Sequence, residues 1–384
     1  MPDSDHAIDD LPPGLVDGVT LSLSGGGYRA MVFHVGALWR LNEVGLLSKL
    51  KRISSVSGGS ITAGALAVAW KDLDFNAGVA RRFDRFVAKV RKMSETNVDV
   101  GAVIGGIFLP GTISDRVAEA YDDVLFGGKT LQDLPDDSAG TAPRFVINAT
   151  NIQSSVLWRF SRPFMGDYRV GLVRNPTVPL SKAVAASSAF PPILSPMSLD
   201  IEQPVEAVKG TDLSRPPYTK TAVLSDGGVY DNLGLETVKS FTTLLVSDAG
   251  QKIAPEPDPH TDWARHSIRI LDTVDNQVRS LRKRQLIDSY QRKDHTGTYW
   301  GIRTHWKDYQ LNDDPLGCRN RDPGPLAEIP TRLQKMPAAE HDKLANWGYA
   351  VCDAALRAHI DAALQAKLGV TIAPPAGFPF AGGY

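Results

Sequence analysis

The chain has 384 residues, of which 42% are apolar and 22% are charged, and its net charge is −1. This is an ordinary globular composition for one large or two modest domains, and the near-neutral charge gives no reason to expect nucleic-acid binding. Two cysteines, Cys318 and Cys352, are too few for a disulfide framework or a metal site of their own, so we expect a reducing, cytoplasmic location.

The N-terminal part of the chain predicts two strand–helix units in succession. Residues 1–16 are acidic and lack an apolar centre, so we expect a flexible arm and no secretory signal. Residues 19–24 alternate as a strand, and a glycine loop separates them from an apolar helix at 30–44. A strand at 53–56 and a helix at 61–70 repeat this arrangement. Such alternation predicts an α/β fold with a mainly parallel central sheet flanked by helices.

Residues 53–70 carry no charge, and eighteen residues are the lower bound for a membrane span. The segment contains four serines and three glycines, however, so a buried strand, turn and helix explain it better.

The remaining chain continues to alternate up to Gly250 and then changes in character. We expect a catalytic core over 17–250 and a C-terminal extension, 251–384, packed on the same domain. Strands are expected at 144–151, 155–161, 218–224, 242–248 and 299–306. Helices are expected at 75–92, 114–125, 180–188, 232–239, 263–292 and 338–367.

Ser57 follows a valine and precedes Gly58 and Gly59 at the first residue after a predicted strand. A tight turn there holds a hydroxyl out of the sheet, and the next helix directs the positive end of its dipole toward it. Ser57 is therefore a candidate nucleophile, although such a turn is also common in ordinary loops.

Three glycines, Gly25, Gly26 and Gly27, lie between the first strand and the first helix. Their N–H groups can bind an anion such as an acyl oxyanion or a phosphate. The spacing from Gly25 to Ala30 also fits the dinucleotide fingerprint, which requires an acidic residue at the end of a second strand. The nearest one, Glu43, lies inside the first helix, so the context argues against a nucleotide site.

Asp226 follows a predicted strand and precedes Gly227 and Gly228. Sheets of α/β proteins place functional groups at strand ends, which makes Asp226 a candidate base. A turn former is the plainer interpretation of the same pattern. Asp231 is better explained as the cap of a helix that starts at Leu233.

Three segments together resemble the signatures of patatin-like phospholipases, in the order that this family has them. They are GGGYR at 25–29, SVSGG around Ser57 and DGG at 226–228, and the segments at 145–151 and 186–191 are similar to further family blocks. The resemblance covers roughly residues 17–250. The nucleophile turn has Ser55 where the family usually has glycine, and its Ser-Gly-Gly form is similar to that of cytosolic phospholipase A2.

The resemblance implies a three-layer patatin-like fold and a Ser57–Asp226 catalytic dyad without histidine, metal or cofactor. Ser57 would attack an ester carbonyl, and Asp226 would accept its proton. Arg29 would orient the glycine loop or contact a lipid phosphate. The oxyanion would be bound by N–H groups of Gly25, Gly26 and Gly27. The two turns would be supported by Gly58, Gly59, Gly227 and Gly228.

A Ser–His–Asp triad is the mechanistic alternative. The histidines beyond Asp226 are His260, His266, His295, His305, His341 and His359, and none has an obvious strand-end context. His34 lies within the first predicted helix and is expected to be a core residue.

The implied substrate is a phospholipid or another lipid ester, with peripheral contact at the inner face of the membrane. Candidate contacts are the apolar residues 98–110, which fit a buried helix and loop equally well, and a basic cluster on a predicted helix. The cluster is formed by Arg279, Arg282, Lys283 and Arg284 and is more typical of a solvated helix face. The alternative function is a non-catalytic module that holds an anionic lipid or a nucleotide at the glycine loop.

Overall fold

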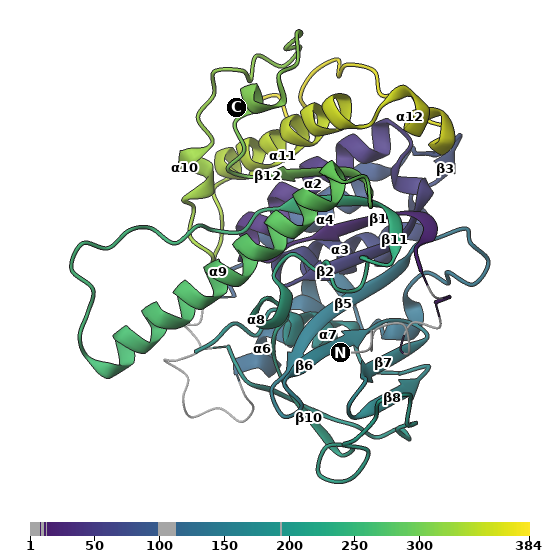
Figure 1. Cartoon of the computed structure of the whole chain (residues 1–384), viewed down its shortest axis with the longest axis vertical. Helices are drawn as coiled ribbons and strands as arrows, with labels where there is room; N and C mark the ends of the chain where they lie inside the picture. The colour runs from purple at the N-terminus through teal and green to yellow at the C-terminus, as the bar shows by residue number, and fades with distance from the viewer. Residues whose placement is uncertain (1–7, 9–10, 13, 99–112, 193) are drawn as a thin grey trace.

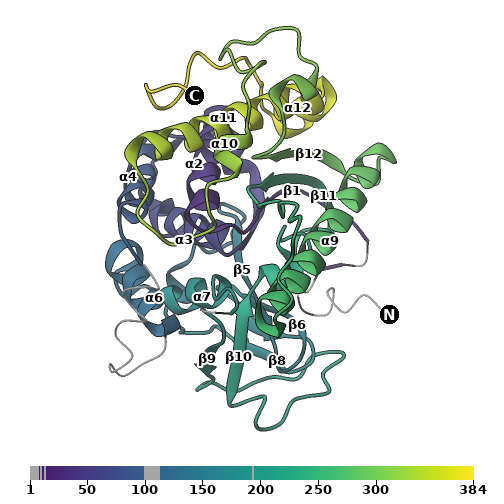
Figure 2. The same ribbon diagram turned by 90° about the vertical axis from the view of Figure 1, so that its left-hand side faces the viewer.

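The protein is built around a ten-stranded mixed sheet with helices on both faces (Figures 1 and 2). The computed structural model describes residues 8, 11–12, 14–98, 113–192 and 194–384. The α/β class is confirmed. One half of the sheet is parallel and carries Ser57 at the end of β2 (Leu50–Val56), and the other half is antiparallel and carries Asp226 at the end of β10 (Thr221–Asp226).

Five parallel strands form the first half of the sheet, in the order β12–β11–β1–β2–β5. Both faces of this half are covered, so nearly every residue of β2, β5 and β11 is buried, the polar ones included. The strands are β1 (Val16–Leu23), β2 (Leu50–Val56), β5 (Arg144–Asn151), β11 (Phe241–Asp248) and β12 (Thr296–Gly301).

The second half is antiparallel and continues from β5 in two directions. One branch runs β5–β6–β7–β8, and the other pairs β5 with β10 and β10 with β9. The strands are β6 (Val156–Phe160), β7 (Phe164–Asp167), β8 (Gly171–Arg174), β9 (Met197–Asp200) and β10 (Thr221–Asp226).

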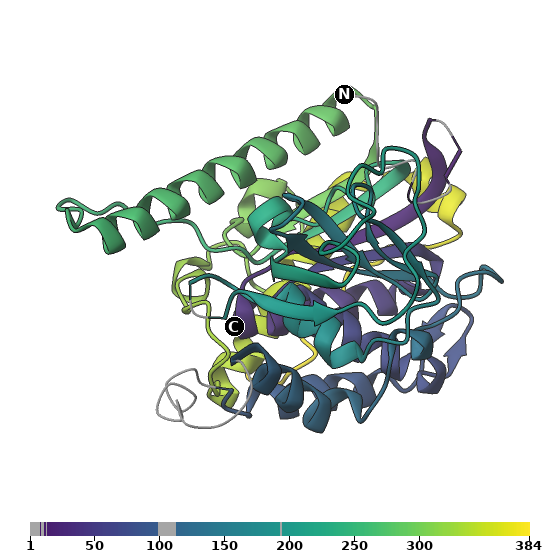
Figure 3. The same ribbon diagram turned by 90° about the horizontal axis from the view of Figure 1, so that it is seen from below.

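Most helices pack on one face of the sheet, and α9 lies on the other (Figure 2). The N-terminal part of α9 extends beyond the body of the protein (Figure 3). The helices are α2 (Gly27–Glu43), α3 (Gly58–Ala69), α4 (Phe83–Ser94), α6 (Ile113–Tyr121), α7 (Leu180–Ser187), α8 (Gly228–Asp231), α9 (Trp263–Gln291), α10 (Gly324–Ala327), α11 (Ala338–His359) and α12 (Ala362–Leu368).

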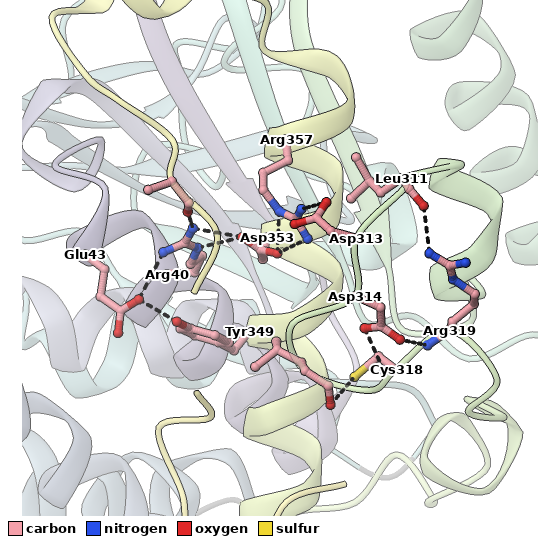
Figure 4. A network of polar contacts seen from close by, with 12 residues as sticks. Arg40, Glu43, Leu311, Asp313, Asp314, Cys318, Arg319, Tyr349, Asp353 and Arg357 are labelled. Atoms are coloured by element: carbon pink, nitrogen blue, oxygen red, sulfur yellow. Dashed lines mark hydrogen bonds and ion pairs between the residues drawn. The ribbon is translucent and has the colours of Figure 1, made fainter. Parts of the chain in front are cut away.

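The C-terminal third is built into the same sheet and the same core. Strand β12 pairs with β11, and Trp300 and Trp347 are buried in the hydrophobic cluster that contains Leu21. Polar contacts also join α11 to α2 (Figure 4). Asp353 of α11 accepts a hydrogen bond of 3.0 Å from Nε of Arg40 in α2, and both side chains are buried.

Two expected helices are placed differently. Residues 75–80 form the short strands β3 (Phe75–Asn76) and β4 (Val79–Ala80), so the helix expected at 75–92 begins only at Phe83. Residues 232–239 form turns, because Asp231 accepts hydrogen bonds from the N–H groups of Leu233 and Glu236.

The uncharged segment at 53–70 is the end of β2 followed by α3, as expected. Within the described ranges, no helix combines the length and the apolar character that a membrane crossing requires. Most of the expected arm at 1–16 and of the apolar segment at 98–110 lies outside the described residues.

Candidate active site

Ser57 occupies the turn between β2 and α3 with backbone angles φ 52° and ψ −120°, a conformation that is strained for a residue with a side chain. Its N–H group donates a 3.0 Å hydrogen bond to Oγ of Ser187, which holds the turn in place. The next residue must be glycine, because a Cβ atom on Gly58 would lie 2.1 Å from the carbonyl oxygen of Gly27. The sequence therefore forces Ser57 out of the sheet and against the glycine loop.

The glycine loop joins β1 to α2, beside the turn of Ser57. Gly26 has φ 140°, in the region that favours glycine. In the described part of the chain, the N–H groups of Gly26 and Gly27 have no hydrogen-bond acceptor, whereas that of Gly25 donates to the carbonyl oxygen of Asn232 at 3.1 Å. Of the three glycines expected to bind an oxyanion, only the second and third thus have free donors at the N-terminus of α2.

Strand pairing brings Asp226 to the same edge of the sheet as Ser57. Val56, directly before Ser57, pairs with Asn148 of β5, and Asp226 at the end of β10 pairs with the next residue, Ala149. Because β10 runs antiparallel to β5, its C-terminal residue lies beside the C-terminal end of β2. Two residues 169 positions apart thereby become neighbours.

The carboxyl group of Asp226 is buried and only partly hydrogen-bonded. The N–H group of Gly228 donates to Oδ1 at 2.7 Å. No described residue donates to Oδ2 at the distance and angle of a hydrogen bond. Burial raises the pKa of Asp226 to about 7, and the Gly228 N–H group and the nearby Ser57 hydroxyl act in the opposite direction. Such a carboxyl group gains or loses its proton near neutral pH.

A cavity of about 300 Å³ joins these elements. Its wall includes Ser57, Asp226, Gly25 and Gly26, together with Phe190 and four residues of α9, namely Asp272, Asp275, Asn276 and Arg279. A nucleophile, a carboxyl group and the glycine loop with the free N–H group of Gly26 thus line one space. This arrangement is suited to acyl transfer.

The sequence model of the patatin-like phospholipase family matches residues 21–239, more than half of the chain. The chain belongs to the patatin-like phospholipase family. This membership supports lipid hydrolase activity, and the matched range contains all the residues that the sequence placed in the site.

Two solved structures are among those with similar chain traces. One is human GIVD cytosolic phospholipase A2 in complex with methyl gamma-linolenyl fluorophosphonate, with 15% identity, a TM-score of 0.48, and coverage of 96% of this chain and 62% of that one. Another is VipD from Legionella pneumophila, with 15% identity, a TM-score of 0.37, and coverage of 91% and 67%. The chain thus spans less than two thirds of that phospholipase A2. No curated protein sequence matched it.

Arg29 of this patatin-like chain does not line the cavity. Its guanidinium group is buried and donates to the carbonyl oxygens of Ala249, at 3.0 and 3.2 Å, and Ile329, at 2.5 Å. Burial lowers its pKa to about 10. Of the two expected roles, this placement favours orientation of the loops over contact with a lipid phosphate.

No histidine among the described residues lines the cavity. His34 is buried beneath the glycine loop, where its ring nitrogens contact Oγ of Ser247 at 2.8 Å and the carbonyl oxygen of Ser24 at 2.9 Å. Burial lowers the pKa of His34 to about 4, so the ring is neutral at physiological pH. It is a core residue, as the sequence predicted, and the geometry does not favour a Ser–His–Asp triad.

Several site residues escaped the sequence analysis. Ser187, at the end of α7, accepts the hydrogen bond from the Ser57 N–H group. Asn232, in the turn after α8, accepts the hydrogen bond from the Gly25 N–H group through its carbonyl oxygen. Ser187 lies in the segment at 186–191 that resembled a family block, which was its only signal. Of the α9 residues that line the cavity, only Arg279 had a signal, as part of the basic cluster, because the contribution of α9 depends on how that helix crosses the sheet.

Proposed function

We propose that this protein hydrolyses ester bonds of phospholipids or related lipids through the Ser57–Asp226 dyad. The observation that carries the proposal is the shared cavity in which the Ser57 hydroxyl faces a buried carboxyl group whose pKa is about 7. General bases work best when their pKa is near the operating pH. An ordinary aspartate, with a pKa near 4, would be a much weaker base.

In the proposed mechanism, ionised Asp226 accepts the Ser57 proton as Oγ attacks the ester carbonyl. The negative charge that develops on the carbonyl oxygen is stabilised by the N–H groups of Gly26 and Gly27 at the positive end of α2. The leaving alcohol takes the proton from Asp226, and an acyl group remains on Ser57. Water then cleaves this acyl-enzyme with Asp226 again as base.

A fluorophosphonate probe tests the proposal directly, because it labels only an activated serine. We expect labelling of the wild type, no labelling of Ser57→Ala, and loss of fatty-acid release from phospholipid vesicles by the same variant. Labelling is measured with and without anionic vesicles, so that an enzyme activated by a lipid surface is also detected.

Ser214→Ala, which removes an exposed hydroxyl that does not line the Ser57 cavity, is the matched control and should label like the wild type. Binding to vesicles without labelling or fatty-acid release under either condition would favour the non-catalytic lipid-binding module instead.

We further propose that the outer face of α9 contacts the lipid surface. This face exposes large apolar side chains at helical spacing, with Trp263 84% and Leu271 63% exposed. The others are Ile270, Val274, Val278 and Leu281. A contiguous exposed apolar stripe of this kind marks an interaction surface.

The charge of α9 favours an anionic bilayer as the occupant. Helix α9 contains six arginines and lysines and three aspartates, a net charge of +3. Two of the aspartates, Asp272 and Asp275, line the Ser57 cavity. A cationic amphipathic helix of this type lies in the plane of the membrane interface. It would bring the cavity, which its opposite face lines, to the lipid.

The basic cluster predicted for membrane contact is distributed differently. Arg282 turns inward and pairs with Glu236 at 3.0 Å, and Lys283 lies over the ring of Tyr299, 4.2 Å from its centroid. Arg279 lines the cavity, and only Arg284 is exposed. The apolar stripe, and not this cluster, therefore carries the proposed contact.

The double variant Leu271→Glu and Val274→Glu should bind anionic vesicles at least about tenfold more weakly, because two apolar side chains no longer enter the lipid. Co-sedimentation with vesicles measures this change. The pair Thr273→Glu and Gln277→Glu adds the same charge at exposed polar positions and is the control. Equal weakening by both pairs would mean that charge alone, and not the stripe, controls binding.

A further inference from the structure

A second cavity of about 530 Å³ adjoins the one that contains Ser57. The two share part of their walls, formed by Gly250, Lys252, Asn276 and Arg279. The second cavity lies between α9 and the end of β12, where Lys283 and Arg303 also face it. The sequence motifs placed none of its residues in the site. Two of them, Arg279 and Lys283, belong to the basic cluster that the sequence proposed for membrane contact.

Four cationic side chains converge on this cavity, namely Lys252, Arg279, Lys283 and Arg303. Within the described part of the chain, none of the four has a carboxylate oxygen within 4.0 Å. The buried Nε of Arg303 has no hydrogen-bond partner there either. Arg282 on the same helix, by contrast, is paired with Asp231 and Glu236.

Two carboxylates also line the cavity, and they do not neutralise it. Asp308 is exposed, and Asp248 is occupied by its own neighbours: it accepts hydrogen bonds of 2.7 Å from the Tyr299 hydroxyl and 2.8 Å from the Gly250 N–H group. Although burial opposes ionisation, Arg279 and these hydrogen bonds keep the pKa of Asp248 below its ordinary value. Four cations therefore face two anions, an excess of two positive charges.

We infer that this cavity binds the phosphate group of the lipid headgroup while the ester lies beside Ser57. Three of the four cations, Arg279, Lys283 and Arg303, are partly buried, and cations that lack an ion pair in such a place are stabilised when an anion joins them. Arginine pairs with phosphate through two parallel hydrogen bonds, and the volume is ample for a headgroup. Arg279 and Lys252 stand at the boundary of the two cavities, where a headgroup would continue into a glycerol ester.

The inference rests on the proposed function and narrows it, because it makes phosphate-bearing lipids the preferred substrates over neutral lipids. It also assigns contact with the phosphate to Arg279 and its neighbours, since the guanidinium group of Arg29 is occupied by backbone carbonyls.

Binding of soluble sn-glycerol 3-phosphate and of inorganic phosphate, measured by calorimetry, tests the site without any need for hydrolysis. In the double variant Lys283→Gln and Arg303→Gln, we expect the dissociation constant of glycerol 3-phosphate to rise about tenfold or more, because charge-assisted hydrogen bonds are lost. Arg303→Lys, which keeps the charge, should recover part of the affinity. Arg284→Gln, an exposed change on the same helix, should bind like the wild type.

A lipid arm distinguishes a headgroup site from a free-phosphate site. The ratio of phosphatidic acid to diacylglycerol hydrolysis should fall about tenfold in the double variant and stay constant in Arg284→Gln. Equal phosphate affinity in the wild type and the double variant would overturn the inference, as would an unchanged lipid ratio. If the protein cleaved no ester but bound phosphate through Lys283 and Arg303, the proposed function would be refuted. The cavity would then be an anion-binding site without a link to hydrolysis.

Discussion

Asp226→Asn is expected to lower ester hydrolysis by a factor of about 10³ while leaving the fold intact. Asparagine keeps the shape of the side chain, and its Oδ1 can still accept from the Gly228 N–H group, but it cannot take the Ser57 proton. General-base catalysis by a positioned side chain contributes about 10² to 10⁴ in rate. Initial rates on phospholipid vesicles and on a soluble aryl ester measure the loss.

The same substitution should stabilise the protein at neutral and alkaline pH. Burial raises the pKa of Asp226 to about 7, whereas the unfolded chain has a value near 4. Unfolding therefore releases a proton between these two values, and the folded state loses relative stability as pH rises from about 4 to 7. Above pH 7 the difference reaches about 4 kcal/mol, which Asp226→Asn would recover. Urea unfolding at pH 8 and at pH 4 should show a gain only at the higher pH.

The sign of the pH effect on activity follows from the same group. Because the base must be ionised, kcat/KM of the wild type should decline as the pH falls below 7. Asp200→Asn, at an exposed carboxyl on β9, is the control and should change neither the profile nor the rate. A wild-type profile that is flat from pH 5 to 8, or an Asp226→Asn variant of normal activity, would mean that another group accepts the proton.

The sequence pointed to both members of the proposed dyad because each lies in a recognisable local pattern. Ser57 lies in a turn where a Cβ on the following residue would collide with Gly27, and Asp226 ends a strand before two glycines. Local patterns of this kind identify a strand, a turn and a helix without knowledge of their neighbours. They do not contain the register of β10 on β5, which brings the two residues together.

What the sequence could not predict depends on contacts between distant segments. Arg29 lies next to the glycine loop in sequence, yet its guanidinium group turns away to Ala249 and Ile329. The Gly25 N–H group looked free until the turn at Asn232 supplied its acceptor. Likewise, α9 was correctly predicted as a helix, but only its position shows which face lines the cavity and which is exposed.

The contact between α2 and α11 gives the second large expected effect, on stability. Replacing Asp353 with alanine should lower the free energy of unfolding by about 3–5 kcal/mol, because two nearly buried arginines lose the buried carboxylate that they share. Their remaining carboxylate partners, Glu43 for Arg40 and Asp313 for Arg357, are more exposed. Nε of Arg40 and Nε of Arg357 donate to the two oxygens of Asp353 at 3.0 and 2.9 Å (Figure 4). Their side chains are only 5% and 7% exposed, so water cannot replace the lost carboxylate. Urea unfolding monitored by tryptophan fluorescence measures the change.

Asp313→Ala separates this effect from the loss of any carboxylate beside Arg357. Asp313 contacts the same Arg357 at 2.8 Å, but its side chain is 57% exposed, so its removal should change stability by less than about 1 kcal/mol. If both variants lost the same small amount, the Asp353 cluster would contribute no more than a surface ion pair. A large loss confined to Asp353→Ala would instead mean that the C-terminal helix stabilises the helix whose first turn forms the glycine loop. In that case, removing residues beyond 337 should also abolish labelling of Ser57.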